Sequence, residues 1–231
     1  MLKQLFDTAT STYTYLLACE RSREAVLIDP VLGQLRRDIA LIEFSGLRLR
    51  WVLDTHVHAD HVTGAAGLRA QFPAARSAVG EACQASGYDQ TLRGGETLAF
   101  GDEQLQVLAT PGHTPGHLSY LWRDRVFTGD ALLIGGCGRT DFQHGDAGQL
   151  WDSITGQLFA LPDETLVYPG HDYQGRSFSS VVHERLHNPR LAGRSREDFI
   201  ALMADLQLKP PQRMAEAVPR NLRAGAPLQA G

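Results

Sequence analysis

Residues 56–61 read His-Val-His-Ala-Asp-His and follow the apolar stretch 49–53, Leu-Arg-Trp-Val-Leu, after Asp54 and Thr55. The apolar stretch predicts a β-strand that delivers the hexapeptide to the edge of a sheet. Successive residues of an extended chain point to opposite sides, so His56 and His58 can direct their imidazoles into one pocket. Imidazole and carboxylate groups at this density are typical of a site for a first-row transition metal, zinc or iron above all. A polar surface loop is the weaker interpretation.

Three further apolar stretches end in the same way, each followed by a turn of small residues that presents a ligand-type side chain. Stretch 105–109 leads to His113, 125–127 leads to Asp130, and 166–168 leads to His171. Open α/β sheets place their sites where strands end, so we expect one site built from four strand ends. The candidate ligands, enough for two metal ions, are His56, His58, Asp60, His61, His113, Asp130 and His171.

Strand-like and helix-like stretches succeed one another along the chain, which predicts an α/β fold in a single domain over residues 1–231. The tail from about residue 208 to 231 is rich in Pro, Gly and Ala, which predicts a C-terminal segment that packs as an extended strap or frays. Ser195 opens a capping pattern for the last helix. Strands are expected at 12–17, 25–28, 49–55, 105–109, 118–122, 125–127 and 166–168, and helices at 35–42, 149–159, 178–186 and 195–206.

The composition is that of an ordinary soluble globular protein, with 43% hydrophobic and 21% charged residues. Lys and Arg number 22 against 26 acidic residues, a net charge of −4, so neither nucleic acid nor an anionic membrane is expected as a partner. The cysteines, Cys19, Cys83 and Cys137, form no Cys-x-x-Cys pair, which favours a reducing compartment. With neither a signal-like start nor an apolar run of roughly 20 residues, a cytoplasmic location is expected.

The order and spacing of the four motifs resemble the metallo-β-lactamase superfamily. They are His-x-His-x-Asp-His from His56, Pro-Gly-His-Thr at His113, Thr-Gly-Asp at Asp130 and a final Pro-Gly-His at His171. The resemblance implies a four-layer αβ/βα sandwich, with two mixed β-sheets face to face, helices outside, and the site at one edge of the sheets.

Flanking stretches narrow the resemblance to the persulfide dioxygenases, the family of the ethylmalonic encephalopathy protein. The similar stretches are 55–64, 127–134, 136–143, 168–173 and 188–191. This family implies that glutathione persulfide, oxygen and water are converted to sulfite and glutathione. It also implies one Fe(II) per subunit, held by His56, His113 and Asp130 as the catalytic and metal-binding residues.

Two histidines and one carboxylate on one face of an octahedron leave roughly three positions for reactants, as in non-haem iron oxygenases. The remaining groups, His58, Asp60, His61 and His171, would then orient the ligands through hydrogen bonds. Alternatively they complete a site for two zinc or iron ions bridged by Asp130, as in glyoxalase II-type hydrolases that cleave the thioester S-lactoylglutathione. The sequence permits both readings. A sensor that binds metal or persulfide without turnover is a third.

By similarity to the thiol-binding loop of the family, we expect Arg139, Asp141 and Tyr173 near a glutathione moiety, because a guanidinium suits a carboxylate. The alternative is that they brace a loop. Cys137 is expected to be a small buried residue and not a reactive one.

His117 is not expected to be a ligand, and His144, His183 and His187 are expected at the surface. Similarity to the family implies a homodimer. Any sulfur delivery would come from a separate rhodanese-type protein. Whether glutathione or another small thiol carries the persulfide is left open by the sequence.

Overall fold

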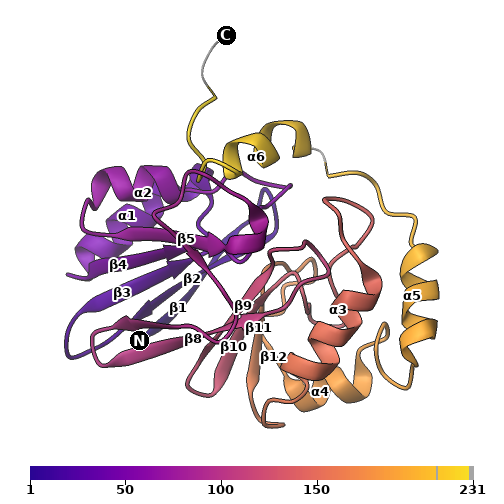
Figure 1. Ribbon diagram of the computed structural model, residues 1–231. Helices are drawn as coiled ribbons and strands as arrows, with labels where there is room; N and C mark the ends of the chain where they lie inside the picture. Colours follow the sequence, from indigo (N-terminus) through magenta and orange to yellow (C-terminus); the bar gives the residue numbers. More distant parts are fainter. Residues whose placement is uncertain (212, 229–231) are drawn as a thin grey trace.

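The computed structural model describes residues 1–211 and 213–228, in which two mixed β-sheets face each other (Figure 1). The first sheet has the order β1-β2-β3-β4-β5-β6 and is formed by the first half of the chain. It changes from antiparallel pairing at β1 to β3 to parallel pairing at β3 to β6. Its strands are β1 (Leu2–Asp7), β2 (Thr12–Ala18), β3 (Glu24–Ile28), β4 (Arg48–Leu53), β5 (Arg76–Gly80) and β6 (Gln90–Leu92).

The second sheet has the order β12-β11-β10-β9-β8-β7. Its pairing is antiparallel except between β10 and β11, which run parallel. Its strands are β7 (Thr97–Phe100), β8 (Glu103–Ala109), β9 (Leu118–Trp122), β10 (Arg125–Gly129), β11 (Leu166–Pro169) and β12 (Ser179–Ser180).

The main core lies between the two sheets, because alternate residues of each strand point toward the opposite sheet. Tyr15 and Leu53 of the first sheet meet Phe127 and Tyr120 of the second, and each of these side chains is 1% exposed or less. The rings of Tyr15 and Phe127 lie 4.8 Å apart. This packing fixes the two sheets relative to each other and therefore the strand ends from which the site is built.

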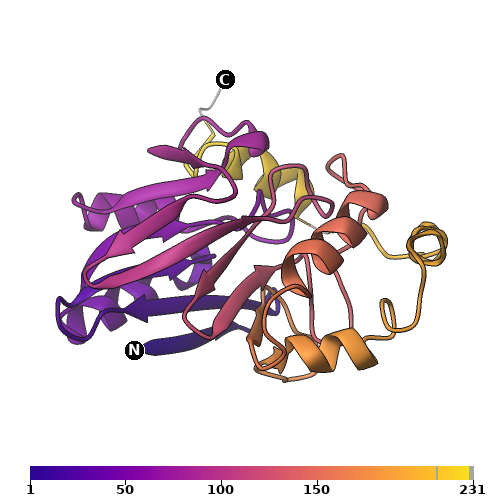
Figure 2. The ribbon, with the colours of Figure 1, turned by 60° about the horizontal axis from the view of Figure 1, so that its bottom comes forward.

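Helices cover the outer face of each sheet (Figures 1 and 2), where two further apolar clusters fill the space between helix and sheet. The order helix, sheet, sheet, helix confirms the predicted four-layer α/β sandwich. The first sheet is covered by α1 (Leu35–Phe44) and α2 (Ala65–Gln71), and the second by α3 (Ala147–Ser153), α4 (Val181–His187) and α5 (Arg196–Ala204). Short 3-10 turns span Leu32–Gln34 and Glu81–Cys83, and a π-helical turn, Ile154–Leu158, extends α3.

The predicted strands are present, and the Ser195 capping box at the start of α5 is confirmed. The helix expected from 178 begins later, at Val181, because Ser179–Ser180 pairs with β11 before Ser180 caps the helix. The prediction of an extended tail was wrong for residues 214–221, which form helix α6 (Met214–Asn221). Its amphipathic sequence packs Ala217 and Asn221 inward, a pattern hidden by the Pro and Gly residues around it.

No helix of the described residues has the length and apolar character needed to span a membrane.

Candidate metal centre

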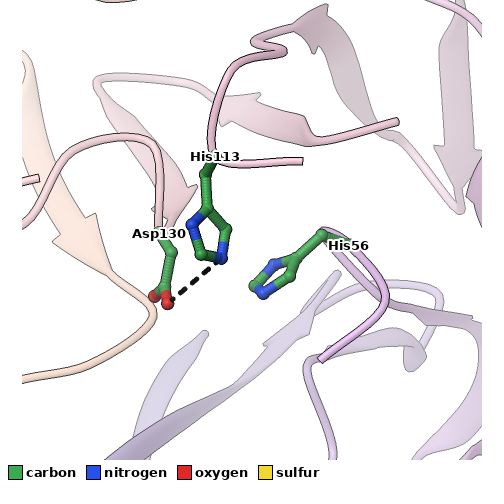
Figure 3. Close-up of side chains that lie close together, drawn as sticks. All are labelled: His56, His113 and Asp130. Carbon is green, nitrogen blue, oxygen red and sulfur yellow. Dashed lines mark ion pairs between the residues drawn. The ribbon is translucent and has the colours of Figure 1, made fainter. Parts of the chain in front are cut away.

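His56, His113 and Asp130 converge although they are far apart in sequence (Figure 3). They follow β4, β8 and β10, so both sheets contribute, as predicted from the strand ends. One potential ligand atom from each lies within 4.8 Å of the other two. His113 Nε2 is 3.7 Å from Asp130 Oδ2. We call these three residues the triad cluster.

The imidazole of His56 is oriented by a hydrogen-bond chain on its outer side. Its Nδ1 lies 3.0 Å from Thr55 Oγ1, and that hydroxyl donates to Asp29 Oδ2 at 2.9 Å. Since the hydroxyl proton is used on Asp29, Nδ1 of His56 is the donor to Thr55. Burial and the neighbouring histidines keep the pKa of His56 well below its usual value, so the ring is neutral. Its Nε2 is then left with a lone pair on the inner side.

His113 is oriented in the same way by a main-chain carbonyl. Its Nδ1 donates to Arg139 O at 2.7 Å, which leaves Nε2 as the acceptor atom facing Asp130. Gly138 permits this contact, because a Cβ there would lie 2.3 Å from Asp130 O and 2.8 Å from His113 Nδ1. The glycine-rich bend therefore acts directly on the geometry of the triad cluster.

Asp130 is held by His171, whose Nδ1 donates to Oδ1 at 2.6 Å. The main-chain N–H of Asp130 donates to Nε2 of His117 at 3.1 Å. Although burial acts in the opposite direction, the positive charge of His171 holds the pKa of the Asp130 carboxyl well below its usual value. With Oδ1 engaged, Oδ2 is the oxygen that faces His113.

The remaining predicted ligands lie beside the triad cluster and bond largely to one another. We call His58, Asp60, His61 and His171 the neighbouring cluster. Asp60 Oδ2 accepts from His61 Nδ1 at 2.8 Å and from His171 Nε2 at 2.9 Å. Both nitrogens of His171 thus donate to carboxylates, and Asp130 and Asp60 outweigh burial to hold its pKa well above the usual value.

Two atoms of the neighbouring cluster have no hydrogen-bond partner among the described residues, His58 Nδ1 and His61 Nε2. His58 uses its other nitrogen on Asp29 Oδ1 at 3.0 Å, and this carboxylate, against the effect of burial, raises the pKa of His58 to about 9. His58, Asp60 and His61 also bring their potential ligand atoms within 4.8 Å of one another. The residue types and spacing of these three side chains therefore suit a second metal ion.

The donor set of the triad cluster fits a first-row transition metal. Each of its side chains has one polar atom bonded outward, to Thr55, Arg139 or His171, and one left facing inward. Metal-binding histidines and carboxylates are commonly fixed by outer partners of this kind. Two imidazoles and one carboxylate match the ligand preference of iron or zinc.

A cavity of about 470 Å³ opens onto the triad cluster and also contacts the neighbouring cluster. Tyr173 lines it with a 73% exposed side chain, stacked at 6.2 Å on the ring of His171. Arg139 lines it too, but its guanidinium donates to both oxygens of Asp141 and to the carbonyls of Leu208 and Lys209. Arg139 and Asp141 thus brace the cavity wall in this structure, the alternative that the sequence left open.

Sequence reasoning missed three residues that support the site. Asp29 directly follows the predicted strand 25–28 and was assigned no role in the site, yet its carboxylate contacts Thr55 and His58. His117 lies 5.0 Å from His56, ring over ring, and burial lowers its pKa to about 3, so it serves as a neutral acceptor for Asp130 N–H. Asn221, whose side chain donates to the carbonyls of His58 and His61, lies in the tail that was predicted to be extended. An acidic residue directly after strand 25–28 was the available signal for Asp29.

The remaining predictions concern isolated side chains. Cys137 is buried, 2% exposed, and its burial raises the pKa of the thiol to about 11, as expected for an unreactive residue. His144, His183 and His187 are exposed, as predicted.

Comparison with known proteins places these features in context. Residues 7–171 match the family model described as the metallo-beta-lactamase superfamily. The chain is 46% identical over 227 residues to the protein named persulfide dioxygenase ETHE1, mitochondrial, of Homo sapiens, covering 97% of this chain and 89% of that one. The crystal structure of ETHE1 from Myxococcus xanthus superposes with a TM-score of 0.95 at 52% identity, covering 98% of this chain and all of that one. A hydroxyacylglutathione hydrolase of Rhodospirillum rubrum is 34% identical over 191 residues, 81% of this chain and 73% of that one.

Proposed function

The chain belongs to the metallo-β-lactamase superfamily, and from this premise we propose that it is a glutathione persulfide dioxygenase. The reaction consumes one glutathione persulfide, one O2 and one water, and it yields glutathione and sulfite. The observation that carries the proposal is the triad cluster, with one inward-facing atom left on each side chain, in a chain 46% identical to a persulfide dioxygenase over almost its full length.

We propose Fe(II) as the metal, one ion per subunit, held by His56, His113 and Asp130. Bound there, ferrous iron would supply open coordination positions at which the persulfide sulfur and dioxygen come together as neighbours. The neutral state of His56 and the ionised state of Asp130 suit this role, because ligands must be deprotonated to bind.

The other residues of the centre act by orientation. Thr55 and Arg139 O fix the tautomers of His56 and His113, and His171 keeps Asp130 Oδ2 turned inward. On this proposal the neighbouring cluster maintains the hydrogen bonds of Asp130 and does not bind the ion. The buried setting, with His56 1% and His113 9% exposed, limits the access of bulk water.

For the glutathione moiety we propose Tyr173 as a contact, because its ring is exposed in the cavity beside His171. Arg139 and Asp141 would shape the wall through their mutual hydrogen bonds and the carbonyls of residues 208 and 209. The cavity also contains Arg190 and Lys209, whose positive charge suits a substrate with two carboxylates.

Oxygen uptake on glutathione persulfide, followed together with sulfite formation, tests the function. Protein loaded anaerobically with Fe(II) is compared with the His113→Ala variant treated identically. We expect stoichiometric uptake and sulfite only with the unaltered chain. Uptake no faster than that of His113→Ala would contradict the proposal.

A dinuclear thioester hydrolase is the second candidate, favoured by the unpartnered His58 Nδ1 and His61 Nε2. It predicts two equivalents of zinc or iron per chain and cleavage of S-lactoylglutathione. Elemental analysis of protein purified without added metal separates the two candidates, since the dioxygenase requires one equivalent of iron.

Three further expectations stay predictions: a homodimer, a separate rhodanese-type protein as sulfur donor, and a cytoplasmic location. Analytical ultracentrifugation, a coupled assay with a rhodanese, and microscopy of the tagged protein would test them in turn.

A further inference from the structure

We propose that Asn221, the last residue of α6, is a positioning residue of the metal centre. Its side-chain Nδ2 donates to His58 O at 2.9 Å and to His61 O at 2.8 Å. Its Oδ1 accepts from Thr63 N at 2.9 Å. The residue is 1% exposed, and one amide thus binds three main-chain groups of the His-x-His-x-Asp-His segment and the turn after it.

The segment depends on such contacts because it has no regular secondary structure of its own. Between β4 and α2 the main chain forms neither strand nor helix. Its carbonyl groups are bonded from remote parts of the fold, Thr55 O by Leu118 N and Val57 O by Gln143 Nε2. Buried carbonyls without a partner are costly, so each such bond restricts the path of the segment. Asn221 supplies the bonds for the carbonyls of His58 and His61, the two histidines of the neighbouring cluster that lie in this segment.

The residues after Asn221 hold the same region from outside. Ala224 O accepts from Ala66 N at the start of α2 at 2.9 Å. Gly225, with a φ of 80°, approaches so closely that a Cβ would lie 2.1 Å from Thr63 O. The C-terminal segment is therefore fitted against residues 63–66, which gives the amide of Asn221 a defined place.

The position of His58 affects the triad cluster through side chains already described. His58 Nε2 contacts Asp29 Oδ1, the same carboxylate fixes Thr55, and Thr55 fixes His56. Release of the His58 carbonyl would loosen this chain of hydrogen bonds at its far end. The expected consequence is a less ordered His56 and weaker metal binding, with little effect on substrate contacts in the cavity.

Two variants test the inference, and Co²⁺ is the probe in both. Asn221→Ala removes all three hydrogen bonds. Asn221→Asp keeps the size of the side chain and the acceptor for Thr63 N, but its carboxylate lacks both N–H donors. Asn188→Ala is the matched control, because Asn188 is also 1% exposed and its amide binds Gly136 O, Glu184 Oε2 and Arg190 N, none of them in the motif.

We expect both Asn221 variants to bind Co²⁺ up to about 10-fold more weakly, at the low end of the range for outer partners of metal ligands, because Asn221 acts on His56 only through His58, Asp29 and Thr55. The visible spectrum of the bound ion should also change. The activity of the iron-loaded variants should fall in kcat with an unchanged KM for persulfide. The control should lose thermal stability but keep the affinity and spectrum of the unaltered protein.

Unaltered Co²⁺ affinity in Asn221→Asp and Asn221→Ala, or an equal loss in Asn188→Ala, would overturn the inference. If one of the two variants does not fold, the other decides. The inference rests on the proposed function only for the presence of a metal. Weaker Co²⁺ binding without any oxygen uptake would refute the dioxygenase and leave the role of Asn221 intact.

Discussion

The triad cluster and the neighbouring cluster contain the same residue types a few ångströms apart, but their hydrogen bonds run differently. In the triad cluster each side chain bonds outward to Thr55, Arg139 or His171 and keeps one atom facing its companions. In the neighbouring cluster Asp60 accepts from His61 and His171, so these donors are used within the group. The residue types thus determine which metals can bind, and the hydrogen-bond partners indicate which of the two clusters binds the metal.

The comparison also explains why the sequence alone allowed one or two ions. A motif shows which side chains can be ligands, whereas the engagement of each ring nitrogen depends on residues from other strands. His171 illustrates this, since one of its nitrogens is bonded to Asp130, just after β10, and the other to Asp60, in the segment between β4 and α2. We therefore expect unequal effects when each cluster is altered.

The largest effect on metal binding is expected for His113→Ala in the triad cluster, compared with His61→Ala in the neighbouring cluster. His113→Ala removes a proposed ligand and should lower the affinity for Fe(II) by more than the roughly 10-fold to 100-fold typical of outer partners. His61→Ala should retain one iron per chain and measurable oxygen uptake. Metal content after anaerobic loading and gel filtration is the measurement.

The unaltered protein could instead bind two metal ions per chain and His61→Ala only one. This result would show that both clusters bind metal, and it would contradict the proposed difference between them.

The second effect concerns His171, the residue that joins the clusters. His171→Ala frees Asp130 Oδ1 and Asp60 Oδ2 from their shared donor, so Asp130 can rotate away from His113. We expect about a 10-fold to 100-fold loss of metal affinity. His183→Ala, which removes an exposed histidine of α4, is the control and should bind metal normally. Isothermal titration with Co²⁺ measures both, and equal affinities would show that His171 does not orient Asp130.

A smaller loss is expected for Thr55→Val, which keeps the shape of the side chain but removes the hydroxyl between His56 and Asp29. His56 Nδ1 and Asp29 Oδ2 both lose a partner in a buried setting, at a cost of about 1–3 kcal/mol in the free energy of unfolding. Metal affinity should fall about 10-fold, at the low end for such partners. Thr155→Val removes a hydroxyl bonded within a helix and is the control. An unchanged metal affinity in Thr55→Val would show that Thr55 does not orient His56.

The parts of this site that the sequence predicted share one physical basis. His56, His113, Asp130 and His171 each follow an apolar stretch, and strand periodicity makes such ends recognisable without knowledge of the fold. Asp29 and Asn221 carry no comparable local signal, because their importance comes from carbonyls and side chains distant in sequence. Arg139 shows the converse, since its residue type suggested a carboxylate of the substrate while the fold supplies Asp141 and two carbonyls.

No effect on metal binding is expected when a buried carboxylate outside both clusters is replaced. Asp38 of α1 is 1% exposed, and burial raises its pKa to about 6 although Arg37 donates to it at 2.8 Å. A carboxyl with a raised pKa stabilises the fold while it is protonated, below its unfolded value near 3.8, and this contribution is lost as the pH rises through 6. Asp38→Asn should therefore raise the free energy of unfolding at pH 7 by about 1–3 kcal/mol, with a difference that vanishes near pH 4. Urea denaturation of both chains across this range measures it; a gain that persists at pH 4 would mean that charge burial is not its cause.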